Sequence, residues 1–125
     1  MRIAKSASQA PIYQLKITLR ESKPPIWRRV QVRSDINLYT LHQIIQWSMG
    51  WTNSHLHLFD LGYEQYSDPE FEVEDTLPEK RARLSVIAPA EKAKFRYEYD
   101  FGDSWDHDIL VEKILPAEPG QQYPV

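Results

Sequence analysis

Histidine and carboxylate residues gather in two segments of this chain, and together they could hold a divalent metal ion. His55 and His57 are one residue apart, so in a strand both imidazoles would point to the same side. Asp103 and His107 lie in a second segment and could complete a shell of nitrogen and oxygen ligands. The metal site requires the two segments to meet. Otherwise the histidines face solvent or pair with the neighbouring carboxylates, which also include Asp100, Asp106 and Asp108.

Aromatic residues are the second group with a chemical role to consider. Four Trp and seven Tyr in 125 residues are more than one small core easily encloses, so some should lie at the surface as a recognition patch. Core packing is the alternative for each of them. The candidate binding residues, which include nearby charged side chains, are Trp27, Arg28, Arg29, Trp51, Tyr97, Tyr99, Asp103 and Trp105.

Basic residues are concentrated near the start of the chain. Residues 1–33 carry eight Lys and Arg against the single Glu21, whereas residues 97–125 carry seven carboxylates against Lys113. Basic side chains around an exposed Trp27 could bind single-stranded nucleic acid. The pI near 5.8 argues against this function, because nucleic-acid-binding proteins usually present a net basic face. The alternative is that opposite charges pair between neighbouring strands. The basic residues concerned are Arg20, Lys23, Arg28, Arg29 and Arg33.

Arg28 would lie on the apolar-facing side of its strand, which requires an explanation. We expect Arg28 and Arg29 to pair with Asp100 and Asp103, with Gly102 permitting a tight turn between these two aspartates.

Several kinds of chemistry lack their residues. The chain has no cysteine, which excludes disulfides, thiolate metal sites and cysteine nucleophiles. It also has no Gly-x-Ser-x-Gly elbow, phosphate loop or dinucleotide fingerprint. We therefore expect a non-catalytic protein with no cofactor other than the candidate divalent metal.

Alternating apolar residues predict strands at both ends of the chain. The pattern runs from residue 13 to 20 and, after the break at Pro24 and Pro25, from 26 to 33. It returns over 55–61, 63–66, 95–101 and 105–115, with a short strand expected near 71–73 in a loop over 67–83. The segment 84–88 is ambiguous.

One helix is predicted over residues 38–49. Apolar residues there follow the helical spacing, with Leu41, Ile44 and Ile45 on one face. Thr40 with Gln43 could form a capping box, Asn37 is a competing start, and Gly50 can end the helix in the left-handed conformation.

These elements predict an α+β fold, an antiparallel or mixed sheet with one main helix packed on it. The order is strand, strand, helix and then several strands, and a β-grasp-like arrangement is one candidate topology. A mass of 14.7 kDa fits one domain. We place it at 12–115, between an N-terminal tail (1–11) and an exposed C-terminal tail (116–125). No apolar run is long enough to span a membrane and the first residues lack a signal peptide, so we expect a cytoplasmic protein.

Four motifs of this chain are familiar together: PPIWRR at 24–29, LHQIIQWSMGW at 41–51, HLHLF at 55–59 and FRYEYDFGDSWDHDI at 95–109. With these motifs, the chain resembles the Ri-plasmid open-reading-frame-three-like family, often labelled insertion-sequence passenger proteins. The family has no established biochemical activity, and its association with mobile elements implies nucleic acid only by analogy. Many relatives continue into a segment of Cys-Pro-Pro-Glu-Asp-Cys-Gly-Gly character, whereas this sequence stops at Val125. It is either a short member or truncated.

Three functions stay open. We favour an accessory or binding module that presents an aromatic and charged surface to a protein or peptide partner. The alternatives are a nucleic-acid-associated factor of a plasmid or mobile element and a divalent-metal-dependent enzyme.

Overall fold

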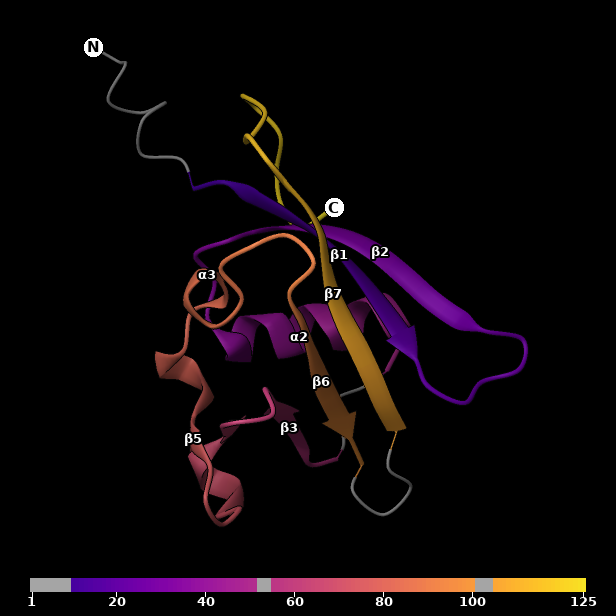
Figure 1. Ribbon diagram of the computed structural model, residues 1–125, viewed down its shortest axis with the longest axis vertical. Helices are drawn as coiled ribbons and strands as arrows, with labels where there is room; N and C mark the ends of the chain where they lie inside the picture. Colours follow the sequence, from indigo (N-terminus) through magenta and orange to yellow (C-terminus); the bar gives the residue numbers. More distant parts are fainter. Residues whose placement is uncertain (1–9, 52–54, 101–104) are drawn as a thin grey trace.

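A computed structural model describes residues 10–51, 55–100 and 105–125 of the chain. Its strands form one sheet in the order β2-β1-β7-β6-β3-β4-β5, and helix α2 lies against one face of this sheet (Figure 1). The pairs are antiparallel except for β4 with β5, so the sheet is mixed. This confirms the α+β class. The strands are β1 (Ile12–Leu19), β2 (Ile26–Arg33), β3 (His57–Asp60), β4 (Gln65–Ser67), β5 (Leu77–Pro78), β6 (Lys94–Tyr99) and β7 (Trp105–Leu115).

The hairpin of β1 and β2 follows directly from alternation in the sequence. Its register runs from Ile12 opposite Arg33 to Leu19 opposite Ile26. Leu15 and Ile17 of β1 are fully buried under the helix, whereas Lys16 between them faces the other side of the sheet. The first four residues of β2 are exposed and only its later half enters the core.

Helix α2 (Leu38–Met49) has the predicted bounds. Asn37 is its N-cap, because its side-chain oxygen accepts a hydrogen bond from the backbone N–H of Thr40 at 2.8 Å. Of the two predicted starts, Asn37 is therefore the one used. Gly50 ends the helix in the left-handed conformation at φ 75°, as predicted.

The segment between β3 and β6 is where the sequence prediction was least accurate. The short strand expected near 71–73 is wrong: η1 (Pro69–Phe71) is a single 3-10 turn, and the short strand is β5, which pairs with β4. A second 3-10 turn, η2 (Glu79–Arg81), and a short helix, α3 (Leu84–Ile87), follow. The segment 84–88, ambiguous in sequence, is thus mainly helical.

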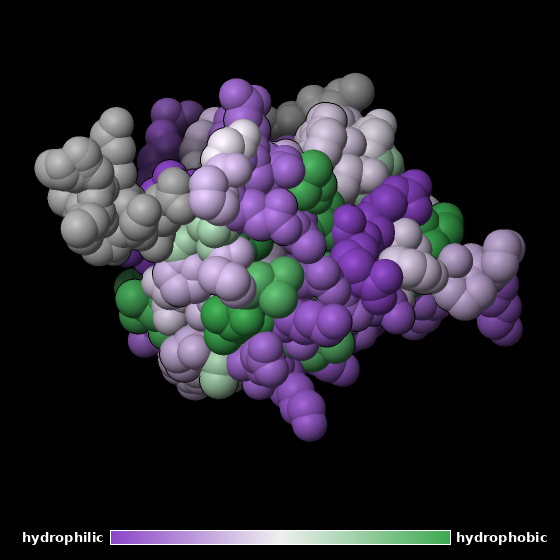
Figure 2. Space-filling model, turned by 90° about the horizontal axis from the view of Figure 1, so that it is seen from above, coloured by the Kyte–Doolittle hydropathy of each residue, from purple (hydrophilic) through white to green (hydrophobic). Residues whose placement is uncertain are grey.

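The core lies between α2 and the sheet. It combines apolar helix residues such as Leu41 and Ile45 with Phe59 and Val111 from the strands. Viewed from above, the surface shows hydrophobic residues as separate patches among hydrophilic ones (Figure 2). Among the described residues, no helix has the length and apolar character that crossing a membrane requires.

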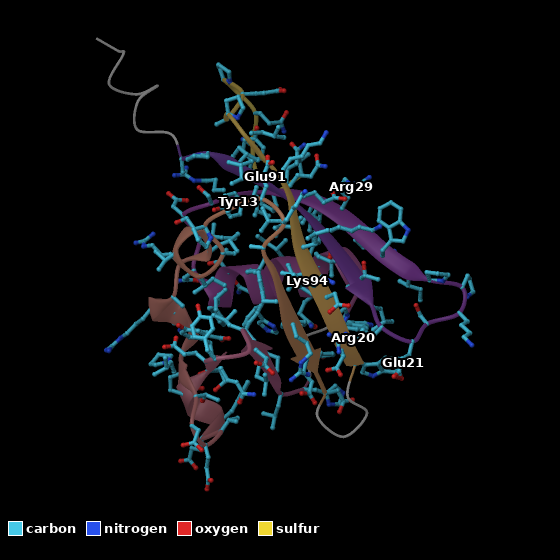
Figure 3. All side chains as sticks on the ribbon, viewed as in Figure 1. Tyr13, Arg20, Glu21, Arg29, Glu91 and Lys94 are labelled. Carbon is cyan, nitrogen blue, oxygen red and sulfur yellow. The ribbon has the colours of Figure 1, made fainter. Side chains whose placement is uncertain are left out.

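The sheet face away from α2 carries ion pairs between the first hairpin and β7. Figure 3 labels their two arginines, Arg20 and Arg29. Arg20 pairs with Asp108 at 2.7 Å, and Arg29 pairs with Glu112 at 2.7 Å. These contacts confirm that the basic first hairpin and the acidic second half of the chain attract each other. The Arg20 guanidinium holds the pKa of Asp108 below its ordinary value, and Arg29 does the same for the pKa of Glu112.

Candidate functional site

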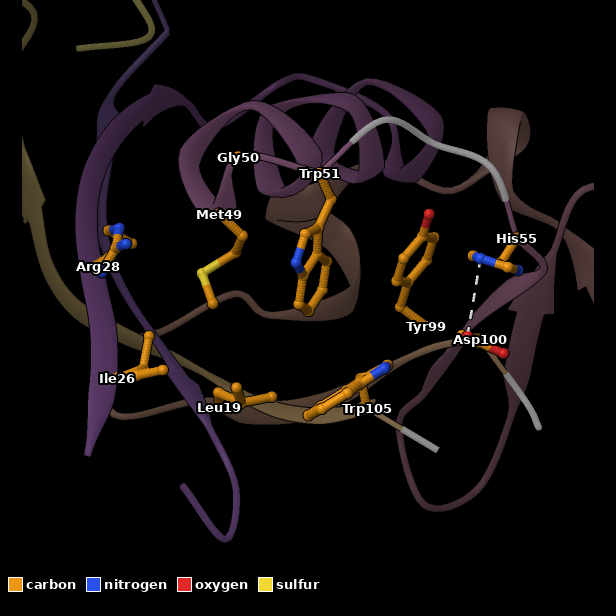
Figure 4. A pocket seen from close by; sticks show the side chains of 10 residues that line it. All are labelled: Leu19, Ile26, Arg28, Met49, Gly50, Trp51, His55, Tyr99, Asp100 and Trp105. Atoms are coloured by element: carbon orange, nitrogen blue, oxygen red, sulfur yellow. Dashed lines mark ion pairs between the residues drawn. The ribbon is translucent and has the colours of Figure 1, made fainter. Parts of the chain in front are cut away.

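A groove opens on the helix side of the sheet, beyond the end of α2. Its volume is about 500 Å³, and Figure 4 shows its side chains. It brings together four of the eight binding residues predicted from the sequence. The lining residues are Leu19, Ile26, Arg28, Met49, Gly50, Trp51, His55, Tyr99, Asp100 and Trp105.

The end of α2 places the central ring of the groove. The Gly50 N–H donates to the Trp47 carbonyl at 3.3 Å, and the Trp51 N–H donates to the Gln46 carbonyl at 2.9 Å. These two bonds form a Schellman motif, which requires the left-handed residue that Gly50 supplies. The chain therefore turns off the helix axis at Gly50, and Trp51 packs onto the sheet.

Aromatic rings form the wall of the groove. The Trp51 and Tyr99 rings stack with centroids 4.9 Å apart and planes at 16°, while the Trp105 ring lies 6.3 Å from Trp51. Tyr99 and Trp105 face each other across the β6–β7 pair, which explains why two residues six positions apart line one surface. Such rings offer apolar area together with hydrogen-bonding tips.

The two ends of the groove carry different charges. At one end, Arg28 donates from Nε to the Ser48 carbonyl and from Nη1 to the Trp27 carbonyl, each at 3.0 Å. At the other end, His55 Nε2 lies 3.7 Å from an oxygen of Asp100, the contact dashed in Figure 4. An apolar wall with a cation at one end and a carboxylate at the other is typical of sites that orient a polar ligand.

The predicted pairing of Arg28 and Arg29 with Asp100 and Asp103 is wrong for the described residues. Arg28 bonds to carbonyl groups, Arg29 pairs with Glu112, and Asp100 faces His55. Asp103 lies outside the described residues. The helix end supplies the Ser48 carbonyl, so an arginine on the apolar side of β2 is satisfied by α2 rather than by a turn carboxylate.

Three predicted binding residues lie elsewhere. Trp27 and Arg29 are on the sheet face away from α2, where the Arg29 guanidinium stacks 5.0 Å from the Trp27 ring. Tyr97 is fully buried, and its hydroxyl accepts a hydrogen bond from Gln46 at 3.0 Å. Burial raises the pKa of the Tyr97 phenol, so this residue belongs to the core.

The histidines among the candidate metal ligands have different partners in the structure. His55 lies before β3 at the groove, while His57 is buried and forms a 2.7 Å hydrogen bond through Nε2 with Glu79. His107 is buried beside Trp51, with ring centroids 5.1 Å apart, and burial lowers its pKa. Among the residues that the structure describes, which leave out Asp103, no group of three or more His, Asp or Glu is placed to hold a metal ion.

Sequence reasoning missed a buried polar network beside these histidines. The His42 and His57 rings stack at 3.5 Å, and His42 Nδ1 lies 2.6 Å from the Tyr97 hydroxyl. A signal was present: Leu38, His42 and Gln46 follow one helical stripe, and all three are buried.

A second cavity of about 420 Å³ adjoins this network. It is lined by Tyr39, His42, His55, Leu56, His57, Asp68 and Phe71.

The structure is a small α+β domain with an aromatic-lined groove on the helix side of its sheet. Residues 11–125 match the family model described as plasmid pRiA4b ORF-3-like protein, and the chain belongs to this family. The resemblance stated from the four sequence motifs is thereby confirmed.

Two similar proteins support this membership without adding an activity. An uncharacterised protein, y4hQ of Sinorhizobium fredii, is 39% identical over 110 residues, which cover 86% of this chain and 57% of that protein. The chain thus spans little more than half the length of this curated relative. The crystal structure of a protein of unknown function, MM3350 from Methanosarcina mazei, matches with a TM-score of 0.82 and 32% identity over 94% of this chain and 68% of that one.

Proposed function

We propose that this protein is a non-catalytic binding module whose groove holds a peptide segment of a partner protein. The observation that carries the proposal is the convergence of Arg28, Trp51, Tyr99 and Trp105 on one surface hollow of about 500 Å³. Such a volume lies within the range of about 300–1,000 Å³ that ligand sites usually have. Aromatic residues and arginine are also the types that dominate recognition surfaces.

The chemistry of the groove indicates what the peptide should present. The wall of Trp51, Tyr99 and Trp105 favours an apolar or aromatic side chain. Arg28 has no carboxylate partner among the described residues, so its charge is available to an acidic group. The opposite end, where His55 meets Asp100, offers donors and an acceptor to peptide groups.

Nucleic acid is the weaker candidate because carboxylates already pair with much of the basic hairpin. Arg20, Arg29 and Arg33 each form an ion pair at 2.7 or 2.8 Å. Phosphate would have to displace these partners. A single-stranded DNA probe that binds and weakens steeply with salt would support this candidate in place of ours.

The proposal is tested with a random heptapeptide phage library panned against the purified protein. Selected peptides, measured by fluorescence polarisation, should bind Trp105→Ala and Arg28→Ala at least about tenfold more weakly, because each change removes one contact worth about 1.4 kcal/mol. Trp47→Ala is the matched control, since Trp47 is 63% exposed on α2 and does not line the groove. Circular dichroism checks that each variant folds.

Two results would contradict the proposal. One is the failure of repeated panning to enrich any peptide. The other is a set of selected peptides whose affinity is the same for wild type, Trp105→Ala and Arg28→Ala.

A further inference from the structure

Strand β2 is an edge strand with one side open to pairing. It has eight residues, and β1 is its one neighbour in the order of the described strands. The strand at the opposite edge, β5, has two residues and includes Pro78. Proline lacks the N–H that a ladder requires. Of the two edges that the described strands form, β2 therefore offers the long one.

The chain itself shows that this edge accepts an extended segment. The Gln31 N–H donates to the Val125 carbonyl at 2.9 Å, and the Val125 N–H donates back to the Gln31 carbonyl at 3.0 Å. Figure 1 shows the C-terminus beside β2. Two such bonds between one pair of residues are the hydrogen-bonded pair of an antiparallel ladder. Residues 116–125, predicted as an exposed tail, are mostly exposed, and their last residue, Val125, returns to the edge of the sheet.

This contact fixes which other backbone groups point outward. The β1–β2 register is continuous, so backbone groups alternate along β2 and those of Arg29 and Trp27 point the same way as those of Gln31. The Trp27 carbonyl accepts from Arg28 Nη1. Among the described residues, the Arg29 N–H and carbonyl have no backbone partner outside the sheet ladders. An extended segment opposite Arg29 could therefore form two further hydrogen bonds.

The groove lies beside this stretch of edge. Ile26 and Arg28 alternate with Trp27 and Arg29, and the first two line the groove. A residue paired opposite Arg28 would present its side chain on the same face of the sheet as Arg28. One extended ligand could therefore pair with β2 through its backbone and place a side chain in the groove.

Charge decides which kind of segment fits. Strand β2 contains three arginines and no carboxylate, and Lys16 adds a cation 4.9 Å from the centre of the Trp27 ring. A second copy of β2 paired antiparallel with Arg29 opposite Arg29 would bring like charges together, which is destabilising. Acidic residues at these positions would meet cations on both faces of the strand, Arg28 on one and Lys16 on the other.

We propose that an extended acidic segment of a partner protein adds to β2 as a new strand and places an apolar side chain in the groove. This inference rests on the proposed function and specifies its binding mode. Backbone bonds to Arg29 supply affinity, while the groove on one face and the cations Arg28 and Lys16 on opposite faces supply selectivity.

The test uses a synthetic acetylated and amidated heptapeptide with a central phenylalanine and glutamate at all remaining positions, so that glutamates fall on both faces of the extended chain, and a copy with lysine in place of glutamate. The acidic peptide should bind and the lysine copy should bind at least about tenfold more weakly. Methylating one backbone nitrogen at a time should then weaken binding at every second position only, because alternate N–H groups of a strand face the edge.

Two variants of the protein test the same hydrogen bonds by changing Arg29 instead of the peptide. Arg29→Pro removes the outward N–H, while Arg29→Ala keeps it, and both lose the ion pair with Glu112. We expect the proline variant to bind the acidic peptide at least about fivefold more weakly than the alanine variant. The methylation series does not depend on either variant folding.

The outcomes separate the two proposals. Binding that is lost in Trp105→Ala but shows no alternation on methylation would overturn strand addition and leave the groove intact as the binding site. Phage-selected peptides that bind while the acidic heptapeptide does not would overturn the acidic partner. Failure of every peptide to bind would overturn both.

Discussion

At the scale of single residues, the buried pair of His57 and Glu79 is the least expected feature. Both side chains are almost fully buried and joined at 2.7 Å, yet 22 positions separate them in the sequence. Burying two such polar groups is costly, and their mutual hydrogen bond offsets part of that cost. His57 was a candidate metal ligand in the sequence. In the structure its partner is the Glu79 carboxylate, and their hydrogen bond connects η2 to β3.

We predict that Glu79→Ala destabilises the protein more than Glu79→Gln does. Alanine leaves His57 Nε2 buried without a partner, and removing one member of a buried pair costs about 3–5 kcal/mol. Glutamine keeps an oxygen within reach and should lose about half of that amount or less. Urea unfolding of wild type and both variants measures the difference. Equal losses in the two variants would show that the hydrogen bond contributes nothing beyond side-chain packing.

Part of the site could be predicted from residue types alone. Arg28, Trp51, Tyr99 and Trp105 were predicted because tryptophan, tyrosine and arginine favour recognition surfaces. Leu19 and Met49 look like ordinary apolar residues, and only the meeting of the first hairpin with the end of α2 places them in the groove. Glu79 had no local signal, because its role depends on a contact from another strand.

At the scale of elements, periodic segments were predictable and short ones were not. The bounds of β2, α2 and β7 agree with the sequence pattern, since each element is long enough for its apolar period to define a buried face. In contrast, β5 has two residues and is a strand only because it pairs with β4. Long-range pairing, which no local pattern encodes, therefore decides the structure between residues 67 and 83.

Arg96 links three strands on the sheet face away from α2. Its guanidinium lies 2.8 Å from Asp60 of β3, 3.2 Å from Glu98 of β6 and 2.7 Å from Asp106 of β7. The arginine side chain is 24% exposed, so these contacts are less screened than those of a fully exposed pair. One planar cation can satisfy three carboxylates because its five N–H groups point in fixed directions.

We predict that Arg96→Met lowers the free energy of unfolding by about 1–3 kcal/mol, because three partly buried carboxylates lose their common donor. Arg96→Lys should lose less, since it keeps the charge but not the planar donors. Lys113→Met on β7, at an exposed position, is the control and should change stability by less than about 0.5 kcal/mol. Chemical denaturation provides the values. A loss in Arg96→Met no larger than in the control would mean that the three carboxylates are fully solvated.

At the scale of the whole molecule, charge complementarity and burial have different roles. The pairs of Arg20 with Asp108 and Arg29 with Glu112 bring the basic and acidic ends of the chain together, but partly exposed pairs add little stability. Stability comes mainly from the core between α2 and the sheet. Titratable groups inside that core therefore affect folding more than those on its surface.

We predict that the stability of the whole protein falls as the pH drops below about 7, in part because of His107. Burial lowers the pKa of His107 from its ordinary 6.5, so below that value the unfolded chain binds a proton that the folded chain resists. The contribution of neutral His107 to the free energy of unfolding is therefore fully present above about pH 6.5 and is lost as the pH falls through the lowered pKa. His107→Asn does not titrate in this range, and an amide can still donate toward the Tyr97 carbonyl, which His107 Nδ1 approaches at 3.3 Å. Urea unfolding at half-unit steps from pH 5.5 to 8 should give a flatter profile for His107→Asn than for wild type. Parallel profiles would show that His107 is protonated as readily in the folded chain as in the unfolded one.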